Sequence, residues 1–151
     1  LIEICNALLE LVEKYNNLII VFPVHPNPNV RKIVNDILHE KNRILLIEPL
    51  DYLSFIFLMK KSYIILTDSG GIQEEAPSLN IPVLVLRTTT ERTEGVKAGT
   101  IKLIGIEKNN IIKNVSHLLS NRIEYSKMTK SENPYGDGLA RMKISSIIKS
   151  I

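Results

Sequence analysis

Residues 63–87 read YIILTDSGGIQEEAPSLNIPVLVLR and hold two apolar runs separated by a polar turn and a short amphipathic segment. Tyr63 to Leu66 and Pro82 to Leu86 are rich in Ile, Leu and Val, which is typical of buried strands. Between them, Thr67 to Gly71 predicts a turn, and Ile72 to Leu79 predicts a short helix that is interrupted or ended near Pro77. A strand, a helix and a second strand in this order predict a parallel βαβ unit.

The same alternation extends in both directions along the chain. Two earlier strands are expected over Leu18 to Val24 and Ile44 to Ile47, and a further brief apolar segment covers Ile101 to Ile104. Helical spacing predicts a first helix around Ile4 to Tyr15 and later helices over Val30 to Glu40, Tyr52 to Lys61, Asn109 to Leu119 and Arg122 to Lys130. We therefore expect an α/β domain with a mostly parallel sheet.

The composition fits one soluble globular domain. The chain has 151 residues, of which 44% are hydrophobic and 23% charged, so it can bury a core without a metal or a disulfide. Its single cysteine, Cys5, excludes an internal disulfide and is expected to be a small buried side chain in a reducing compartment. The apolar runs are far shorter than the roughly 20 residues of a membrane span, so none is expected to cross a bilayer. The protein is expected to be cytoplasmic.

The charged residues argue against nucleic-acid binding. The 19 basic and 16 acidic residues give a net charge of +3 and are interspersed along the chain. Nucleic-acid-binding proteins usually carry a basic stripe with aromatic side chains between the charges, whereas 5% of these residues are aromatic and none is Trp.

Both ends of the chain indicate contacts beyond one domain. The first residue is Leu1 rather than Met and lies directly in a helical pattern, so the chain is expected to be cut from a longer protein, or at least to lack its own start. Asn133 to Gly138 predicts a linker or turn. The segment after it has apolar residues at helical spacing, namely Ile144, Ile147, Ile148 and Ile151. We expect residues 1–135 to form the domain and residues 136–151 to form a closing amphipathic helix that needs a partner surface.

The turn at Asp68, Ser69, Gly70 and Gly71 is the most informative candidate for a binding site. It lies between the carboxyl end of a strand and the start of a helix, where free N–H groups and the helix dipole favour an anion such as phosphate. Ser69 is expected to cap the helix, and the glycines would let a ligand approach the backbone. The alternative is an ordinary capped turn whose glycines serve only its geometry.

Glu75 lies one helical turn after Gly71 on the same face of the expected helix. A carboxylate there could accept hydrogen bonds from both hydroxyls of a ribose. The alternative is an ordinary acidic residue of an early helical turn, which is how we interpret the adjacent Glu74.

Other candidates come from neighbouring loops, because all strand-to-helix loops of a parallel sheet leave at one edge. Arg92 could bind a phosphate or carboxylate, or could pair with Glu91 or Glu94 at the surface. His25 could bind an anion or merely cap its loop. Phe55 could stack on a base or belong to the core.

Several catalytic motifs are absent from the sequence. It contains no Walker sequence, no GxGxxG, no metal-ligand spacing of Cys and His, and no GxSxG nucleophile elbow. These absences disfavour a redox dinucleotide enzyme, a metal hydrolase and an acyl hydrolase, and we expect neither a cofactor nor a metal.

Six segments together resemble the non-hydrolysing UDP-N-acetylglucosamine 2-epimerases. The most specific are TDSGGIQEEAPSLNIPVLVLR at residues 67–87 and TTER at residues 89–92. The others are VHPNPNVR at 24–31, EPLDYL at 48–53, EGVKAGTIKLIG at 94–105 and NPYGDG at 133–138. The resemblance covers essentially the whole chain. It implies a Rossmann-like three-layer α/β/α fold, similar to the second of the two domains of a GT-B fold.

The resemblance implies an enzyme that interconverts UDP-GlcNAc and UDP-ManNAc. It would eliminate UDP to give a 2-acetamidoglucal and then add UDP back to complete the epimerisation at C2. The second domain would hold UDP, whereas the carboxylates that handle the C2 proton would lie in the first domain, so no catalytic residue is expected in this chain. Alone it would bind UDP weakly without catalysis, and the full-length protein is expected to be a homodimer.

The same resemblance implies a role for each candidate residue. The implied contacts are Ser69, Gly70 and Gly71 for the diphosphate, Glu75 for the ribose hydroxyls, Arg92 at the nucleotide, Phe55 packed on the uracil, Leu50 at the uracil edge through its backbone, and His25 beside a regulatory second UDP-GlcNAc.

Two other functions remain open from the sequence. The nucleotide half of a GT-B glycosyltransferase shares the same crevice but transfers the sugar to an acceptor. A free-standing UDP-sugar-binding module would bind UDP-GlcNAc without a second domain.

Overall fold

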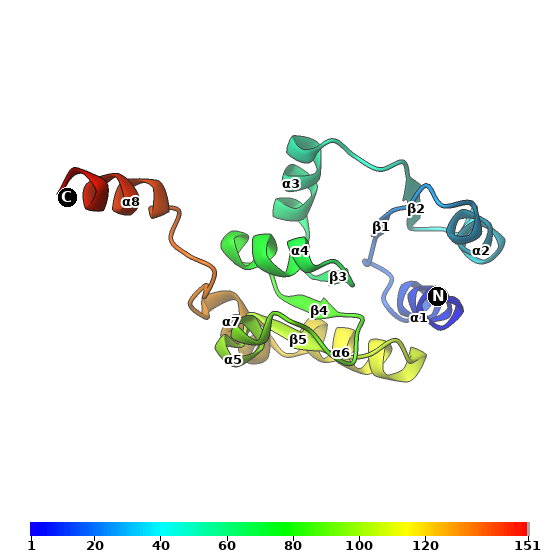
Figure 1. The fold of residues 1–151 in the computed structure, drawn as a ribbon. Coiled ribbons are helices and arrows are strands. Elements are labelled where there is room, and N and C mark those ends of the chain that lie inside the picture. The colour runs from blue at the N-terminus through cyan, green and yellow to red at the C-terminus, as the bar shows by residue number, and fades with distance from the viewer. Residues whose placement is uncertain (151) are drawn as a thin grey trace.

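Short parallel strands form the centre of the computed structural model, which describes residues 1–150 (Figure 1). The strands are β1 (Ile20–Pro23), β2 (Ile44–Ile47), β3 (Ile65–Thr67), β4 (Val83–Val85) and β5 (Ile101–Leu103). The helices are α1 (Ile2–Lys14), α2 (Pro28–Leu38), α3 (Tyr52–Lys61), α4 (Gly70–Glu75), α5 (Thr93–Ala98), α6 (Lys108–Ser120), α7 (Arg122–Lys130) and α8 (Ala140–Lys149). A 3₁₀ turn, η1 (Ala76–Leu79), continues α4.

The parallel arrangement of the strands is confirmed, but their hydrogen bonds divide them into two groups. β1 pairs with β2, and β4 pairs with both β3 and β5. Figure 1 shows the two groups side by side in the order β2, β1, β3, β4, β5. Leu66 of β3 also packs against the apolar cluster of the β1–β2 pair. The chain therefore runs outward from β1 to β2 and then returns across β1 to β3. Ligands of open α/β sheets bind outside the carboxyl ends of the strands at such a reversal.

The side chains of β4 show why the fold has three layers. Leu84 packs on one face against Ala7 and Leu11 of α1 and the apolar stripe of α6. Val83 and Val85 point to the other face, where they meet Met59 of α3. All three β4 residues are buried, since successive side chains of a strand alternate between the faces of a sheet. The expected α/β/α layering is thus confirmed, with α1, α2 and α6 on one side and α3 and α4 on the other.

One helix, α5, was not expected from the sequence. It has six residues, TEGVKA, and these are too few to show an apolar period, while Gly95 in its middle lowers helix propensity. The helix α4 also begins at Gly70, two residues earlier than expected. Both differences affect the loops beside the strand ends and therefore the candidate site.

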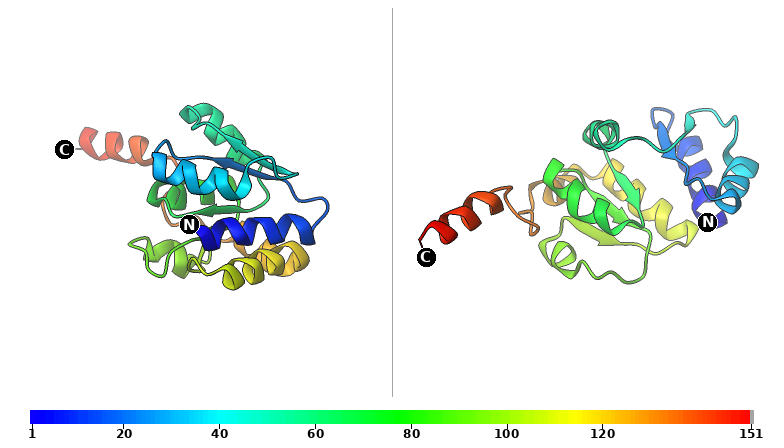
Figure 2. Two further views of the ribbon diagram at one scale, coloured as in Figure 1. Left: turned by 90° about the vertical axis from the view of Figure 1, so that its right-hand side faces the viewer. Right: turned by 45° about the horizontal axis from the view of Figure 1, so that its top comes forward.

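The last helix, α8, projects from the domain in all views (Figures 1 and 2). Its Met142, Ile144, Ile147 and Ile148 are each more than half exposed. The expected amphipathic helix is therefore present over Ala140–Lys149 but packs on no part of residues 1–135, and Ile151 lies outside the described residues. Over residues 1–150, no helix has the length and apolar character of a membrane span.

Candidate functional site

The turn between β3 and α4 is held by the backbone and by two buried side chains. The Ser69 N–H donates to the buried Thr67 Oγ1 at 3.0 Å. The Ser69 carbonyl accepts from Gln73 twice, from the backbone N–H at 3.3 Å and from Nε2 at 3.2 Å. Ser69 occupies the N-cap position, but its hydroxyl makes no capping hydrogen bond, so the expectation that Ser69 caps the helix is wrong. Thr67 provides the local hydrogen bond instead, and the Ser69 side chain stays exposed.

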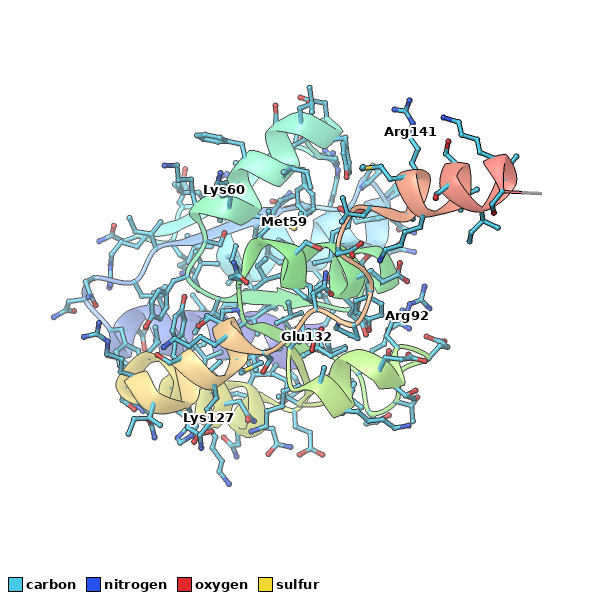
Figure 3. The ribbon with its side chains drawn as sticks, turned by 90° about the vertical axis from the view of Figure 1, so that its left-hand side faces the viewer. Met59, Lys60, Arg92, Lys127, Glu132 and Arg141 are labelled. Atoms are coloured by element: carbon cyan, nitrogen blue, oxygen red, sulfur yellow. The ribbon has the colours of Figure 1, made fainter. Side chains whose placement is uncertain are left out.

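Arg92 lies across the start of α4, although η1, β4 and the loop after β4 separate it from α4 in the chain. Its Nε donates to Glu74 Oε1 at 2.8 Å. A Cβ added to Gly70 would lie 3.1 Å from Arg92 Cζ and Nη2, so the guanidinium sits directly over this glycine. The hydrogen bond to Glu74 raises the pKa of Arg92, which keeps its charge fixed. Figure 3 shows Arg92 on the side of the molecule from which α8 extends.

The surface pair of Arg92 with Glu91 that was considered from the sequence is present, but it is not the shortest contact of Arg92. Glu91 Oε2 lies 3.5 Å from Arg92 Nη1, whereas the shorter contact is to Glu74. Glu74 lies in a short helix as interpreted from the sequence, and in addition it holds Arg92. No sequence pattern predicts the contact between Glu74 and Arg92, because it depends on how the loop after β4 returns to α4.

A buried glutamine of α4, Gln73, holds the loop that follows β4 through a hydrogen bond. Gln73 is fully buried, and its Oε1 accepts a hydrogen bond from Thr90 Oγ1 at 2.7 Å. Thr90 Oγ1 in turn accepts from the Arg92 N–H at 3.1 Å. Both polar ends of the Gln73 amide are thereby satisfied, as a buried polar group requires. The sequence did not single out Gln73 or Thr90, and a lone Gln in a short helix carries no signal of burial.

A segment from far along the chain completes this corner of the molecule. Tyr135 Oη accepts from the Gly95 N–H at 3.1 Å and donates to the Arg92 carbonyl at 3.4 Å. Asn133 Nδ2 donates to Ser78 Oγ at 2.8 Å. The NPYGDG segment, interpreted from the sequence as a linker or turn, is therefore also bound to η1 and α5.

The loop after β1 is ordered by His25 and Asn27. His25 Nδ1 accepts from the Asn27 N–H at 3.2 Å, and Asn27 Oδ1 accepts from the Asn29 N–H at 2.9 Å. The second bond caps α2. His25 thus caps its loop, which is one of the two roles considered from the sequence. Its imidazole is exposed, and Nε2 takes no part in this bond.

The loop after β2 is bonded to α2 at one end, and at its other end Asp51 caps α3. Arg31 donates two hydrogen bonds to the carboxylate of Glu48, with Nη1 to Oε1 at 3.0 Å and Nη2 to Oε2. Asp51 accepts from Ser54 N at 3.1 Å and Ser54 Oγ at 2.6 Å, and these bonds lower the pKa of Asp51. The loop that presents Leu50 therefore has fixed ends.

The remaining candidates make no hydrogen bond or ion pair to Arg92 within residues 1–150. Phe55 is half-buried and packs at the edge of the core, against the cluster that contains Met59, Val83 and Val85. Leu50 is 38% exposed. Glu75 is half-buried and takes part in no salt bridge within residues 1–150. The structure thus brings Arg92 onto Gly70, while His25, Leu50 and Phe55 occupy or follow the other loops at the carboxyl ends of the strands.

The acidic and histidine side chains do not gather into a metal site in the part of the chain that the structure describes. Residues 1–150 contain no group of three or more His, Cys, Asp or Glu that could hold a metal ion. Arg92 places a fixed positive charge at this edge, which suits an anionic ligand.

The fold and site define a Rossmann-like parallel α/β domain with a cationic group over the glycine turn that follows β3. The family model described as UDP-N-acetylglucosamine 2-epimerase matches residues 1–149. The chain belongs to the UDP-N-acetylglucosamine 2-epimerase family.

Individual relatives agree with this assignment. The chain is 51% identical to the UDP-N-acetylglucosamine 2-epimerase of Escherichia coli K12 over 148 residues, which cover 98% of this chain and 39% of that protein. It is 53% identical to the Campylobacter jejuni enzyme over 147 residues, or 97% of this chain and 38% of the relative. The chain therefore spans about two fifths of the length of these relatives.

Solved structures of the family have the same fold. The UDP-GlcNAc 2-epimerase of Neisseria meningitidis, bound to UDP-GlcNAc, superposes with a TM-score of 0.92 at 52% identity, over 98% of this chain and 40% of that one. S. aureus MnaA, solved with UDP, gives a TM-score of 0.93 at 51% identity with the same coverage. UDP-GlcNAc 2-epimerases have a GT-B-like fold, which confirms the expected fold class.

Proposed function

We propose that this chain forms the UDP-binding part of an enzyme that interconverts UDP-GlcNAc and UDP-ManNAc. The observation that carries the proposal is the position of Arg92 over Gly70, at the glycine turn after β3. It supports an anion site at the sheet edge where ligands of α/β folds bind. Relatives about half identical to the chain have been solved with UDP and with UDP-GlcNAc, which supports UDP as that anion.

Ser69, Gly70 and Gly71 hold the diphosphate in this proposal. The Ser69 hydroxyl is not used as a helix cap and is therefore available to a phosphate oxygen. Arg92 adds a charged fork of N–H donors from above Gly70. Donors fixed in place before the reaction stabilise the charge that builds on UDP as it leaves the sugar.

The nucleoside is held by residues of other elements. Glu75 binds the ribose hydroxyls. Its carboxylate makes no salt bridge within residues 1–150, so no such bond has to break when the ribose binds. Phe55 packs on the uracil with the exposed part of its ring, while the rest of the ring anchors it in the Met59 cluster. Leu50 contacts the uracil edge through its backbone.

His25 contacts a second, regulatory UDP-GlcNAc. Because Nδ1 accepts a hydrogen bond from the Asn27 N–H, the neutral imidazole carries its proton on Nε2. This nitrogen can donate to a phosphate or sugar oxygen of the effector.

The chemical steps on the sugar require groups outside this chain. Elimination and re-addition of UDP need carboxylates that move the C2 proton, and the family resemblance assigns these to the first domain of the enzyme. The isolated chain therefore binds UDP weakly and does not epimerise UDP-GlcNAc. Residues 136–151 close onto the first domain, whose surface would cover the apolar side chains of α8. The complete enzyme is a cytoplasmic homodimer.

Calorimetric titration of the 151-residue chain with UDP and UDP-GlcNAc tests the proposal. We expect binding of both ligands, and a loss of about tenfold or more in UDP affinity for Arg92→Ala. Arg87→Ala is the matched control, because Arg87 lies in the same loop and pairs only weakly with Glu91, at 3.9 Å. Absence of UDP binding by the unaltered chain, or equal losses in the two arginine variants, would contradict the proposal. Substantial turnover by the chain alone would contradict the assignment of the chemistry to another domain.

A further inference from the structure

Arg92 occupies a position in α5 that arginine does not usually fill. It is the N-cap residue of the helix and makes no side-chain capping hydrogen bond. Helix N-caps are usually Ser, Thr, Asp or Asn, whose short side chains accept from the free N–H groups of the first turn. The Arg92 side chain has no acceptor and instead extends to Glu74. The first turn of α5 therefore needs a capping group from elsewhere.

Tyr135 supplies that group from 40 residues further along the chain. Its Oη accepts the N–H of Gly95, the third residue of α5, at 3.1 Å. This is the N–H that an N-cap side chain would normally bind. The same hydroxyl donates to the carbonyl of Arg92 at 3.4 Å, so it holds the backbone on both sides of the start of the helix.

Gly95 fits this contact because it has no side chain. A Cβ at position 95 would lie 2.6 Å from Tyr135 Oη, closer than real Cβ contacts allow. It would also lie 3.1 Å from Ile101 Cδ1. The absence of a side chain at Gly95 thus makes room for the hydroxyl of Tyr135.

Tyr135 is itself fixed to the body of the domain. Its N–H donates to Asn133 Oδ1 at 3.1 Å, and Asn133 Nδ2 donates to Ser78 Oγ in η1 at 2.8 Å. Burial raises the pKa of Tyr135, so the hydroxyl keeps its proton and remains a donor. The segment therefore joins the 3₁₀ turn that follows α4 to the first turn of α5.

We propose that Tyr135 is a positioning residue of the anion site, which caps α5 in place of its N-cap side chain so that position 92 can hold an arginine directed at Gly70. The inference rests on the proposed function, because it assigns the ligand of Arg92 as the diphosphate of UDP. Tyr135 does not touch the ligand and acts through the backbone of Arg92. Loss of its hydroxyl should therefore weaken binding of phosphate-bearing ligands and leave binding of the nucleoside unchanged.

Calorimetry with UDP and with uridine on Tyr135→Phe separates these effects. The variant keeps the ring and removes both hydrogen bonds, so we expect UDP affinity to fall by about three- to tenfold and uridine affinity to stay within about twofold. Tyr15→Phe is the matched control, since it removes a tyrosine hydroxyl at the end of α1 and should change neither affinity. Equal losses for UDP and uridine, or no loss for UDP, would overturn the proposal.

Two further measurements keep the test independent of the proposed function. The NMR signal of the Arg92 Nε–H, which is bonded to Glu74, should shift and exchange faster with solvent in Tyr135→Phe even without ligand. Gly95→Ala should change the same signal, because its Cβ displaces the tyrosine hydroxyl. If UDP does not bind the unaltered chain, the proposed function fails, and the Arg92 signal still decides whether Tyr135 positions Arg92. An unchanged signal in both variants would contradict the inference.

Discussion

The guanidinium of Arg92 is held by the carboxylate of Glu74, with 2.8 Å between Arg92 Nε and Glu74 Oε1. Glu74 lies on α4 and Arg92 begins α5, so the pair joins the two elements that follow β3 and β4. The bond uses the Nε–H and leaves Cζ and Nη2 of the guanidinium over Gly70. Because the guanidinium has five N–H donors, most of them stay available to an anion at the glycine turn. Glu74 therefore orients the group that we assign to the diphosphate.

Replacing Glu74 separates orientation from charge. Glu74→Ala should weaken UDP binding by about two- to fivefold, because Arg92 loses the acceptor that fixes its direction. Glu74→Gln keeps an acceptor oxygen and removes a negative charge beside the diphosphate, so UDP affinity should equal or exceed that of the unaltered chain. Calorimetric titrations with UDP measure both variants.

Glu91→Gln is the control for this pair, because Glu91 is exposed and lies 3.5 Å from Arg92 Nη1. It should change UDP affinity by less than about twofold. If Glu74→Gln lost as much affinity as Glu74→Ala, the acceptor geometry would not be what matters, and the assigned role of Glu74 would be wrong.

The buried amide of Gln73 should be important for both stability and binding. Gln73→Leu leaves the Thr90 hydroxyl without its acceptor and removes the Nε2 bond to Ser69, so the free energy of unfolding should fall by about 1–3 kcal/mol. Urea denaturation measures this loss. UDP affinity should fall as well, because Thr90 no longer holds the backbone of Arg92 in place.

A double-mutant cycle tests whether Gln73 and Thr90 act together. Thr90→Val removes the hydroxyl that Gln73 accepts from, so the variant carrying both changes should lose less stability than the sum of the single losses. Strictly additive losses would contradict a coupled Gln73–Thr90 contact.

The single thiol predicts how stability depends on alkaline pH. Cys5 is fully buried, and burial raises the pKa of its thiol above the ordinary value of 9.0. A folded-state pKa above the unfolded one gives a stabilisation that is complete below the unfolded pKa and is lost as the pH rises through the folded pKa. The free energy of unfolding should thus fall more steeply above about pH 9 than in Cys5→Ala.

Urea denaturation from pH 7 to pH 10 compares the two slopes, whatever the absolute cost of removing the sulfur. In the native chain the thiol should also resist a thiol reagent that modifies it readily in denaturant. Parallel curves for the two proteins would show that burial does not shift this pKa.

Much of the fold could be predicted from apolar patterns because these report burial directly. Tyr52 to Lys61 and Arg122 to Lys130 were expected as helices and have these bounds in the structure. The buried side chain of Cys5 was also expected. Such features depend on residues close in the sequence, which is what periodicity detects.

The connections around Arg92 could not be predicted in the same way. Glu74, Gln73 and Tyr135 reach the loop of Arg92 across 17 to 43 positions of sequence through side-chain hydrogen bonds. No period or spacing rule links residues at such separations. The helix α5 is too short to show an apolar period, and its cap likewise comes from the distant Tyr135 rather than from a neighbouring residue.

A substitution of Ser69 distinguishes a phosphate-binding turn from an ordinary capped turn. Its hydroxyl is exposed and does not cap α4, so Ser69→Ala should change the free energy of unfolding by less than about 0.5 kcal/mol. If this hydroxyl binds a phosphate oxygen, the same variant should lose about threefold or more in UDP affinity. Thermal or urea unfolding and calorimetry on one preparation give both values.

Asn121 is the matched control, because its side chain does cap a helix. Asn121 Oδ1 accepts from the N–H groups of Ile123 and Glu124, each at 3.1 Å, at the start of α7. Asn121→Ala should therefore cost about 1 kcal/mol of stability and leave UDP affinity unchanged. The opposite pattern, in which Ser69→Ala destabilises the fold as Asn121→Ala does and UDP binds as before, would mean that the glycine turn serves only the geometry of the chain.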